Sequence, residues 1–307
     1  MKSERRLSSL LRSAAAGFAL TASVAYAAPG SSVRPITNPT LFDNPTPQTN
    51  IHAIAMHQTL PSVIETTIGN VPVGGDFNLL ALQFEIAFNE SLSLVATKDG
   101  YIDFNPNATF SKSEGFANLA AGLKYLFVSS DENDLAVSGT LTAELPSGNR
   151  DVWQGEGDGY INAILNASKS AGNVGLISSL GYRQPMGSED PSITFLSAHA
   201  NYDLQNGFYP IVEFNWFHVS RAGNGSPRFP DQVGGLVPAI GVFEGGDLIS
   251  LGSQYATYNR DIMTGALGFR YSIDDKQNIG IAYESVFTGD EDNLMDDRIT
   301  IDYILKF

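Results

Sequence analysis

In many segments of this sequence polar and apolar side chains alternate, and the charged members of the polar set are the residues best placed to do chemistry. Glu85, Lys124 and Arg270 each stand between two large apolar neighbours. Because successive side chains of a β-strand point to opposite faces, this spacing gives a segment one apolar and one charged face. The charged faces could bind a polar solute, or their members could pair with one another. The candidate binding residues are Glu85, Lys124, Glu144, Arg183, Glu213, Arg270 and Glu284.

A second pattern with chemical potential is His218-Val219-Ser220. On a strand both polar side chains share one face, where a histidine could act as the general base for a serine nucleophile. Some membrane lipid hydrolases use such a pair, but there an asparagine follows the serine, and here Arg221 does. The pattern also supplies no acid partner. We therefore predict no catalytic residues and no enzyme activity, with a lipid hydrolase as an alternative.

Composition excludes several other classes of function. The chain has no cysteine, so it holds neither a disulfide framework nor a thiolate metal site. His52, His57 and His199 are scattered, and we predict no metal site and no cofactor. The net charge of −15 argues against a nucleic-acid partner, because phosphate binding needs a basic face.

The first 27 residues have the three parts of a secretory signal peptide. Basic residues come first, an apolar run over 13–26 follows, and Ala25-Tyr26-Ala27 forms a cleavage site. Removing this piece, which carries a net charge of three positive, takes the chain from −15 to −18. Beyond it no run of apolar residues is long enough for a transmembrane helix. We expect the signal peptide over 1–27, a periplasmic N-terminal arm over 28–50 and a folded domain over 51–307.

The folded domain consists of segments with period-2 alternation, of the length that a tilted membrane-spanning strand needs. Short polar turns and longer polar loops alternate between them, as in bacterial outer-membrane barrels. The predicted fold is all-β, a transmembrane antiparallel up-and-down β-barrel of about twelve strands, closed because an open sheet edge is costly in lipid. The predicted strands are 52–69, 76–88, 91–103, 116–128, 134–145, 158–170, 173–184, 192–204, 208–219, 259–273, 277–288 and 297–307.

The last predicted strand alternates regularly and ends the chain on Phe307. It resembles the C-terminal assembly signal of Gram-negative outer-membrane barrels. We therefore expect localisation in the bacterial outer membrane and recognition of this strand by the barrel-assembly machinery. Outer-membrane lipid and lipopolysaccharide would surround a barrel that we expect to be a monomer.

Two features leave the state of the lumen open. The charged faces have mixed signs, so they could form a salt-bridge network that fills a narrow barrel, or line a pore or ligand site. Loop 220–258 is long, rich in Gly and Pro, and contains the apolar stretch 233–243. It could fold back as a lid over the lumen or extend from the surface.

The segments 115–127 (GFANLAAGLKYLF), 142–149 (TAELPSGN) and 209–218 (YPIVEFNWFH), with the C-terminal strand, resemble a family of bacterial outer-membrane proteins named for the meta-pathway of phenol degradation. The resemblance implies a transporter of small, often aromatic, compounds and defines no chemistry.

The predicted function is a channel or transporter-like barrel for passive passage of a small-molecule solute, hydrophobic or aromatic compounds included. A closed structural or adhesion barrel that acts through its loops, and the lipid hydrolase built on His218 and Ser220, are the alternatives.

Overall fold

The computed structural model describes residues 32–66, 68–224, 229, 232–235, 237, 248–249, 260–289 and 293–307. The predicted signal peptide lies outside these residues. None of the helices within the described ranges is long and apolar enough to cross a membrane.

The described chain is almost entirely β-structure, with two short 3-10 turns, η1 (Arg150–Val152) and η2 (Val233–Gly235). The strands are β1 (Asn50–Thr59), β2 (Val63–Ile64), β3 (Val71–Pro72), β4 (Gly75–Ala87), β5 (Leu92–Lys98), β6 (Tyr101–Pro106), β7 (Ser113–Phe116), β8 (Leu119–Ser130), β9 (Leu135–Leu145), β10 (Tyr160–Ala171), β11 (Val174–Pro185), β12 (Ser192–Tyr202), β13 (Phe208–Arg221), β14 (Asp261–Ser272), β15 (Gln277–Val286) and β16 (Asp297–Lys306).

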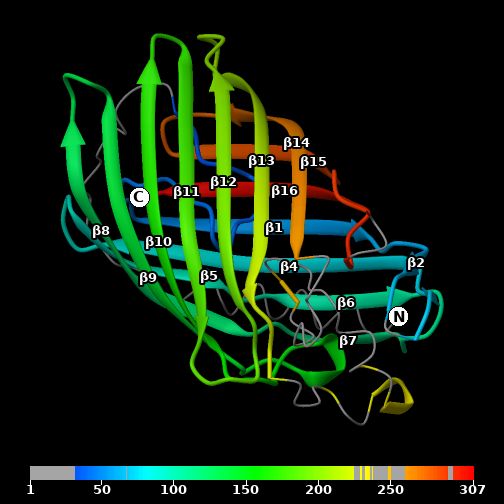
Figure 1. Ribbon diagram of the computed structural model, residues 1–307. Helices are drawn as coiled ribbons and strands as arrows, with labels where there is room; N and C mark the ends of the chain where they lie inside the picture. Colours follow the sequence, from blue (N-terminus) through cyan, green and yellow to red (C-terminus); the bar gives the residue numbers. More distant parts are fainter. Residues whose placement is uncertain are drawn as a thin grey trace, which may run out of the picture.

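The large sheet closes into a barrel because β1 pairs with β16 on one side and with β4 on the other (Figure 1). Every pairing around the ring is antiparallel, and the closed barrel has twelve strands, as predicted from the alternation. β2 and β3 form a separate two-stranded hairpin after β1, where the predicted first strand continued to residue 69. Pro61 stands where β1 has ended, which suits a residue that cannot donate a hydrogen bond to a ladder.

One of the twelve predicted strands is interrupted at Asp99-Gly100, so that β5 and β6 pair with different parts of β4. At the break the Leu82 backbone N–H donates to the carboxylate of Asp99 over 3.0 Å. Gly100 has a φ of +124°, and a Cβ there would lie 2.8 Å from the Leu80 carbonyl oxygen. Only glycine fits this bend without strain.

The outer face of the barrel is apolar and the inner face polar, as the alternation predicted. On β8, Leu123 and Tyr125 are about half exposed, whereas Lys124 between them is 1% exposed. The same alternation places Leu267 outside and Arg270 inside on β14. A continuous apolar outer face is what contact with lipid requires.

An apolar cluster fills the barrel toward the long-loop end, which is the predicted extracellular end. It packs inward-facing residues of β1, β4 and β6, such as Phe77 and Phe104, against Trp153 after η1. Four of the described residues of loop 220–258 join this cluster and are buried: Phe229, Val237, Leu248 and Ile249. Much of the predicted lid lies outside the described residues.

Candidate functional site

All seven charged residues singled out from the sequence are buried on the inner face of the barrel, each with no more than 4% of its surface exposed. They come from seven different strands: Glu85 (β4), Lys124 (β8), Glu144 (β9), Arg183 (β11), Glu213 (β13), Arg270 (β14) and Glu284 (β15). Burial of so many charges requires that each be paired. Their partners therefore define what occupies the lumen.

The main occupant is the chain before β1, residues 32–49, which we call the lumen segment (dark blue in Figure 1). We had predicted a periplasmic arm here, but these residues lie inside the barrel. The lumen segment begins beside Ser170 and Asn201, at the short-turn end of the wall. It reverses at Asn38, which has a φ of +50° and whose carbonyl accepts the N–H of Phe42. It then returns to the same end, where β1 begins.

Glu213 holds the middle of the lumen segment through its backbone. Its carboxylate accepts the N–H groups of Ile36 (2.9 Å) and Thr37 (2.7 Å), and also the Thr37 hydroxyl. His199 of β12 contacts the same carboxylate through Nδ1 at 2.7 Å. Buried backbone N–H groups need a hydrogen-bond acceptor, and here no neighbouring strand supplies one. The Glu213 carboxylate takes that place for the N–H groups of Ile36 and Thr37.

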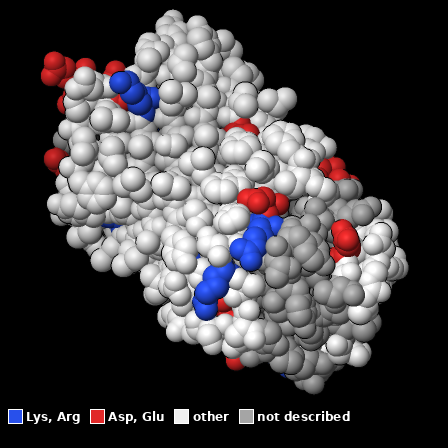
Figure 2. Space-filling view, viewed as in Figure 1, with Lys and Arg blue, Asp and Glu red and all other residues white. Residues whose placement is uncertain are grey.

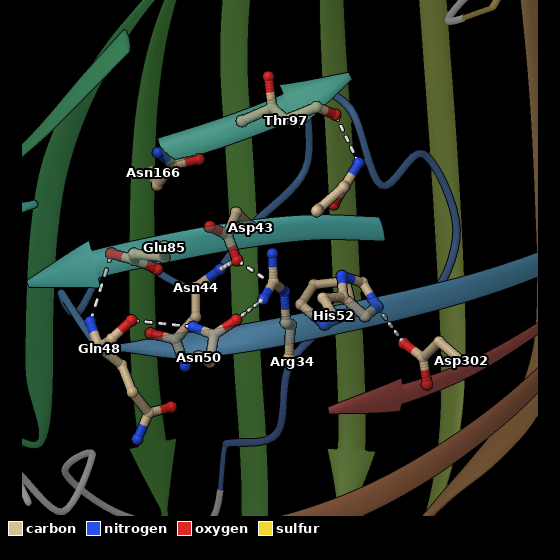
Figure 3. A network of polar contacts seen from close by, with 12 residues as sticks. Arg34, Asp43, Asn44, Gln48, Asn50, His52, Glu85, Thr97, Asn166 and Asp302 are labelled. Atoms are coloured by element: carbon tan, nitrogen blue, oxygen red, sulfur yellow. Dashed lines mark hydrogen bonds and ion pairs between the residues drawn. The ribbon is translucent and has the colours of Figure 1, made fainter. Parts of the chain in front are cut away.

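Lys124 holds the returning half of the lumen segment. Its Nζ donates to Asp43 (2.7 Å), to the Asn44 carbonyl (2.9 Å) and to Glu85 (3.0 Å). Arg34 reaches Asp43 from the other side at 2.9 Å, as Figure 3 shows. Burial alone would raise the pKa of Asp43, but the positive charges of Arg34 and Lys124 outweigh it and hold that pKa at about 2. Asp43 is therefore ionised at all physiological pH values.

Arg270 holds the first half of the lumen segment. Its Nε donates to the Arg34 carbonyl at 2.9 Å, and its terminal nitrogens bind Asp302 of β16 in a bidentate pair at 2.7 and 3.0 Å. His52 of β1 contacts the same carboxylate through Nε2 at 2.8 Å (Figure 3). A bidentate guanidinium–carboxylate pair fixes geometry better than a lysine could.

Glu144 and Arg183 lie nearer the long-loop end of the barrel and pair with each other at 3.0 Å. Lys98 of β5 also contacts Glu144, at 2.6 Å, and donates to the Leu248 carbonyl at 3.1 Å. Gln154 donates to that carbonyl as well, at 2.9 Å. The cavity lined by these groups has only about 10 Å³, room for about one water molecule.

Glu284 belongs to the wall and not to the lumen segment. It accepts hydrogen bonds from Thr264 and Asn215, and lies 3.6 Å from Arg298 of β16. Asn215 in turn donates to the Thr37 hydroxyl, so Asn215 links Glu284 to the lumen segment.

Sequence reasoning missed five charged or ionisable members of this network: Arg34, Asp43, His52, Lys98 and His199. Two of them, His52 and His199, could have been found, because they stand in the inward phase of strands that were predicted. Arg34 and Asp43 lie in a segment without periodicity, which carries no signal for the face or the depth of a residue.

The two side chains of the His-x-Ser pair share one face of β13, as predicted, and this is the outer face of the barrel. His218 contacts Asp261 of β14 through Nδ1 at 2.9 Å, an acid partner that the sequence pattern did not show. Ser220, however, hydrogen-bonds to Thr194 at 2.7 Å, and the described residues show no hydrogen bond between His218 and Ser220. In this structure His218 and Ser220 are therefore hydrogen-bonded to different partners and not to each other. Among the described residues no group of acidic, histidine or cysteine side chains could hold a metal ion.

No family model matches the chain, and no curated protein is matched. Among solved structures, the COG4313 outer membrane channel from Pseudomonas putida F1 is similar over 85% of this chain and 96% of that one, with a TM-score of 0.57 and 11% identity. The KdgM porin in complex with disordered oligogalacturonate matches over 84% and 99%, with a TM-score of 0.45 and 10% identity. The first likeness shows that the chain has the fold of an outer-membrane channel. The resemblance to the phenol-degradation family stays a prediction.

Proposed function

We propose that this protein is an outer-membrane channel for the passive passage of small molecules, and that the lumen segment closes it. The observation that carries the proposal is the way residues 32–49 are held. Side chains hold the segment by hydrogen bonds and ion pairs through Glu213, Lys124 and Arg270, and it pairs with no strand of the barrel. A segment held in this way can leave without breaking the ladder of the wall.

Both ends of the lumen segment lie at the periplasmic end, so it can withdraw in that direction as one loop. Withdrawal would expose the charged residues of seven strands to water in a twelve-stranded barrel. Barrels of this size stand between small, side-chain-filled barrels and wide porins. A narrow pore with mixed charges on its wall is the expected result, and it would pass small solutes.

The test is single-channel conductance of refolded protein in a planar bilayer. A reversible lock is available because the chain has no cysteine of its own. Asn38 and Ser197 are in side-chain contact at 3.0 Å, so Asn38→Cys with Ser197→Cys would tether the lumen segment to β12. We expect the oxidised protein to stay closed, and the reduced protein to show wild-type openings.

A second variant, which lacks residues 34–47, should conduct continuously with larger steps. The matched control is Asn38→Cys alone, which cannot form the tether and should conduct alike with and without reductant. Silence of the deletion variant, once its barrel has been shown to be folded, would contradict the channel. It would favour the closed structural barrel that acts through its loops.

A further inference from the structure

A polar cluster lies on the outer face of the barrel, at the extracellular end of β12–β14. The proposed passage of solutes through the lumen does not involve it. Trp216, His218 and Ser220 follow one another on the outward side of β13. The strand register places His218 beside Thr194 of β12 and Asp261 of β14. The rim cluster, as we call it, consists of Thr194, Trp216, His218, Ser220, Arg221 and Asp261.

Asp261 fixes the rings of the rim cluster. Its Oδ1 accepts the indole N–H of Trp216 at 2.7 Å and contacts Nδ1 of His218 at 2.9 Å. The two rings are stacked, with their centroids 5.7 Å apart. The imidazole is thus held in one orientation at a site where its side chain remains one-third exposed. An ordered aromatic pair with a polar edge is typical of the boundary between lipid and water.

The other members of the rim cluster offer hydrogen-bond donors. Ser220 and Thr194 share a hydrogen bond of 2.7 Å, and Ser220 is exposed. Arg221 is exposed at the end of β13, where its Nε donates to Ser192 at 3.3 Å. Figure 2 shows basic groups beside an acidic one over the lower ends of β13 and β14, on a face that is otherwise largely uncharged. Hydroxyl, imidazole and guanidinium groups together suit a phosphate ester.

Thr194 belongs to a second feature as well, a shallow apolar groove that crosses the outer face of β8–β12. The groove is open along its length, has a volume of about 770 Å³ and is lined by apolar side chains such as Leu141, Leu180 and Tyr182. The register joins Thr194 to Tyr182, Tyr182 to Ala163 and Ala163 to Leu141 in one row across the wall. Ala163 is the small residue in the middle of this row, and Thr194 at its end lines the groove and belongs to the rim cluster, so the groove and the rim cluster adjoin.

We propose that the rim cluster and the groove together bind lipid A of the outer leaflet, with a glucosamine phosphate at His218 and Arg221 and an acyl chain along Ala163. A water-soluble phosphate would make no use of an apolar groove of this length. Glycerophospholipids occupy the inner leaflet, at the other end of the strands. The lipid-binding proposal assumes the membrane orientation given above, but it does not assume that a solute passes through the barrel. An experiment can therefore contradict either proposal without contradicting the other.

The test is native mass spectrometry of the purified protein in detergent, titrated with bisphosphorylated lipid A. We expect His218→Gln with Arg221→Gln to weaken binding about tenfold or more, because charge-assisted contacts to the phosphate are lost. Ala163→Phe should also weaken binding by filling the floor of the groove. The matched control is His57→Gln, which changes an exposed outward histidine of β1 that contacts Asn78. This control should bind like the wild type.

Phosphatidylglycerol serves as the competing probe and should bind more weakly than lipid A. Three results would overturn the proposal: wild-type affinity in the His218/Arg221 variant, an equal loss in the His57 control, or equal affinity for phosphatidylglycerol. All variants are first shown to be folded by heat-dependent migration on gels, so loss of binding cannot be a loss of the barrel.

Discussion

The buried charges of the lumen differ in what they hold. Glu213 accepts backbone N–H groups of the lumen segment, so its partners would be any residues at positions 36 and 37. Lys124 instead binds side-chain carboxylates, and one of them, Asp43, belongs to the lumen segment itself. The first contact tolerates sequence change in the segment, whereas the second depends on a particular residue. Substitutions at the two sites should therefore act differently.

Lys124→Met should destabilise the protein strongly. The substitution removes the ammonium group that pairs with both Glu85 and Asp43, and leaves these two buried carboxylates beside each other. Breaking a buried ion pair by removal of one partner typically costs about 3–5 kcal/mol. The measurement is urea unfolding in lipid vesicles. Lys276→Met, in an exposed turn, is the matched control and should change the free energy of unfolding by less than about 0.5 kcal/mol. Equal effects of the two substitutions would contradict the role given to Lys124.

Mild acid should leave the Asp43 contacts intact. The pKa of Asp43 is lowered from 3.8 to about 2 in the folded protein, so its contribution to stability is complete above the unfolded value. That contribution declines only as the pH falls from about 4 toward 2. We expect the Asp43→Asn variant and the wild type to differ in unfolding free energy by the same amount at pH 7 and pH 5. A difference that changes between pH 7 and pH 5 would show that the pKa of Asp43 in the folded protein is raised by burial and not lowered.

At the scale of the elements, strand phase was the part of the structure that the sequence could predict. Twelve alternating segments were enough to place Lys124 and Arg270 inside and Leu123 and Leu267 outside. The lumen segment could not be predicted, because its residues 32–49 have no period and their partners lie on distant strands. The acid partner of His218 was missed for the same reason, since Asp261 is 43 residues away and meets it only through the register of β13 and β14.

The interruption between β5 and β6 gives an element-scale prediction. Gly100→Ala should cost roughly 1–3 kcal/mol, because the φ of +124° is strained for alanine and the added Cβ meets the Leu80 carbonyl oxygen. Gly172→Ala is the control, because its φ of +60° is left-handed but nothing lies within 4 Å of the new Cβ. The control should lose about 1 kcal/mol. A larger loss at Gly172 than at Gly100 in the same unfolding assay would contradict this account of the bend.

At the scale of the whole molecule, the barrel is filled from both ends by different chemistry. The part toward the short turns holds the lumen segment through ion pairs and hydrogen bonds around Asp43 and Glu213. The part toward the long loops holds the described loop residues Phe229 and Leu248 in an apolar cluster. Raised salt weakens exposed charge pairs and leaves apolar contacts largely unaffected. In the conductance assay, the deletion variant should therefore retain a constriction that salt does not remove.

The pairing of β1 with β16 also has a consequence for how this chain acquires its structure. The two strands that meet there are the first and the last of the barrel, and Ile54 lies opposite Asp302. No N-terminal portion of the chain can close the barrel by itself, so the barrel cannot form until the last strand, β16, is available to pair with β1. Contacts between such distant residues form slowly. The yield of folded protein therefore depends on preventing aggregation of the unfolded chain before the barrel closes, as well as on the contacts within the folded barrel.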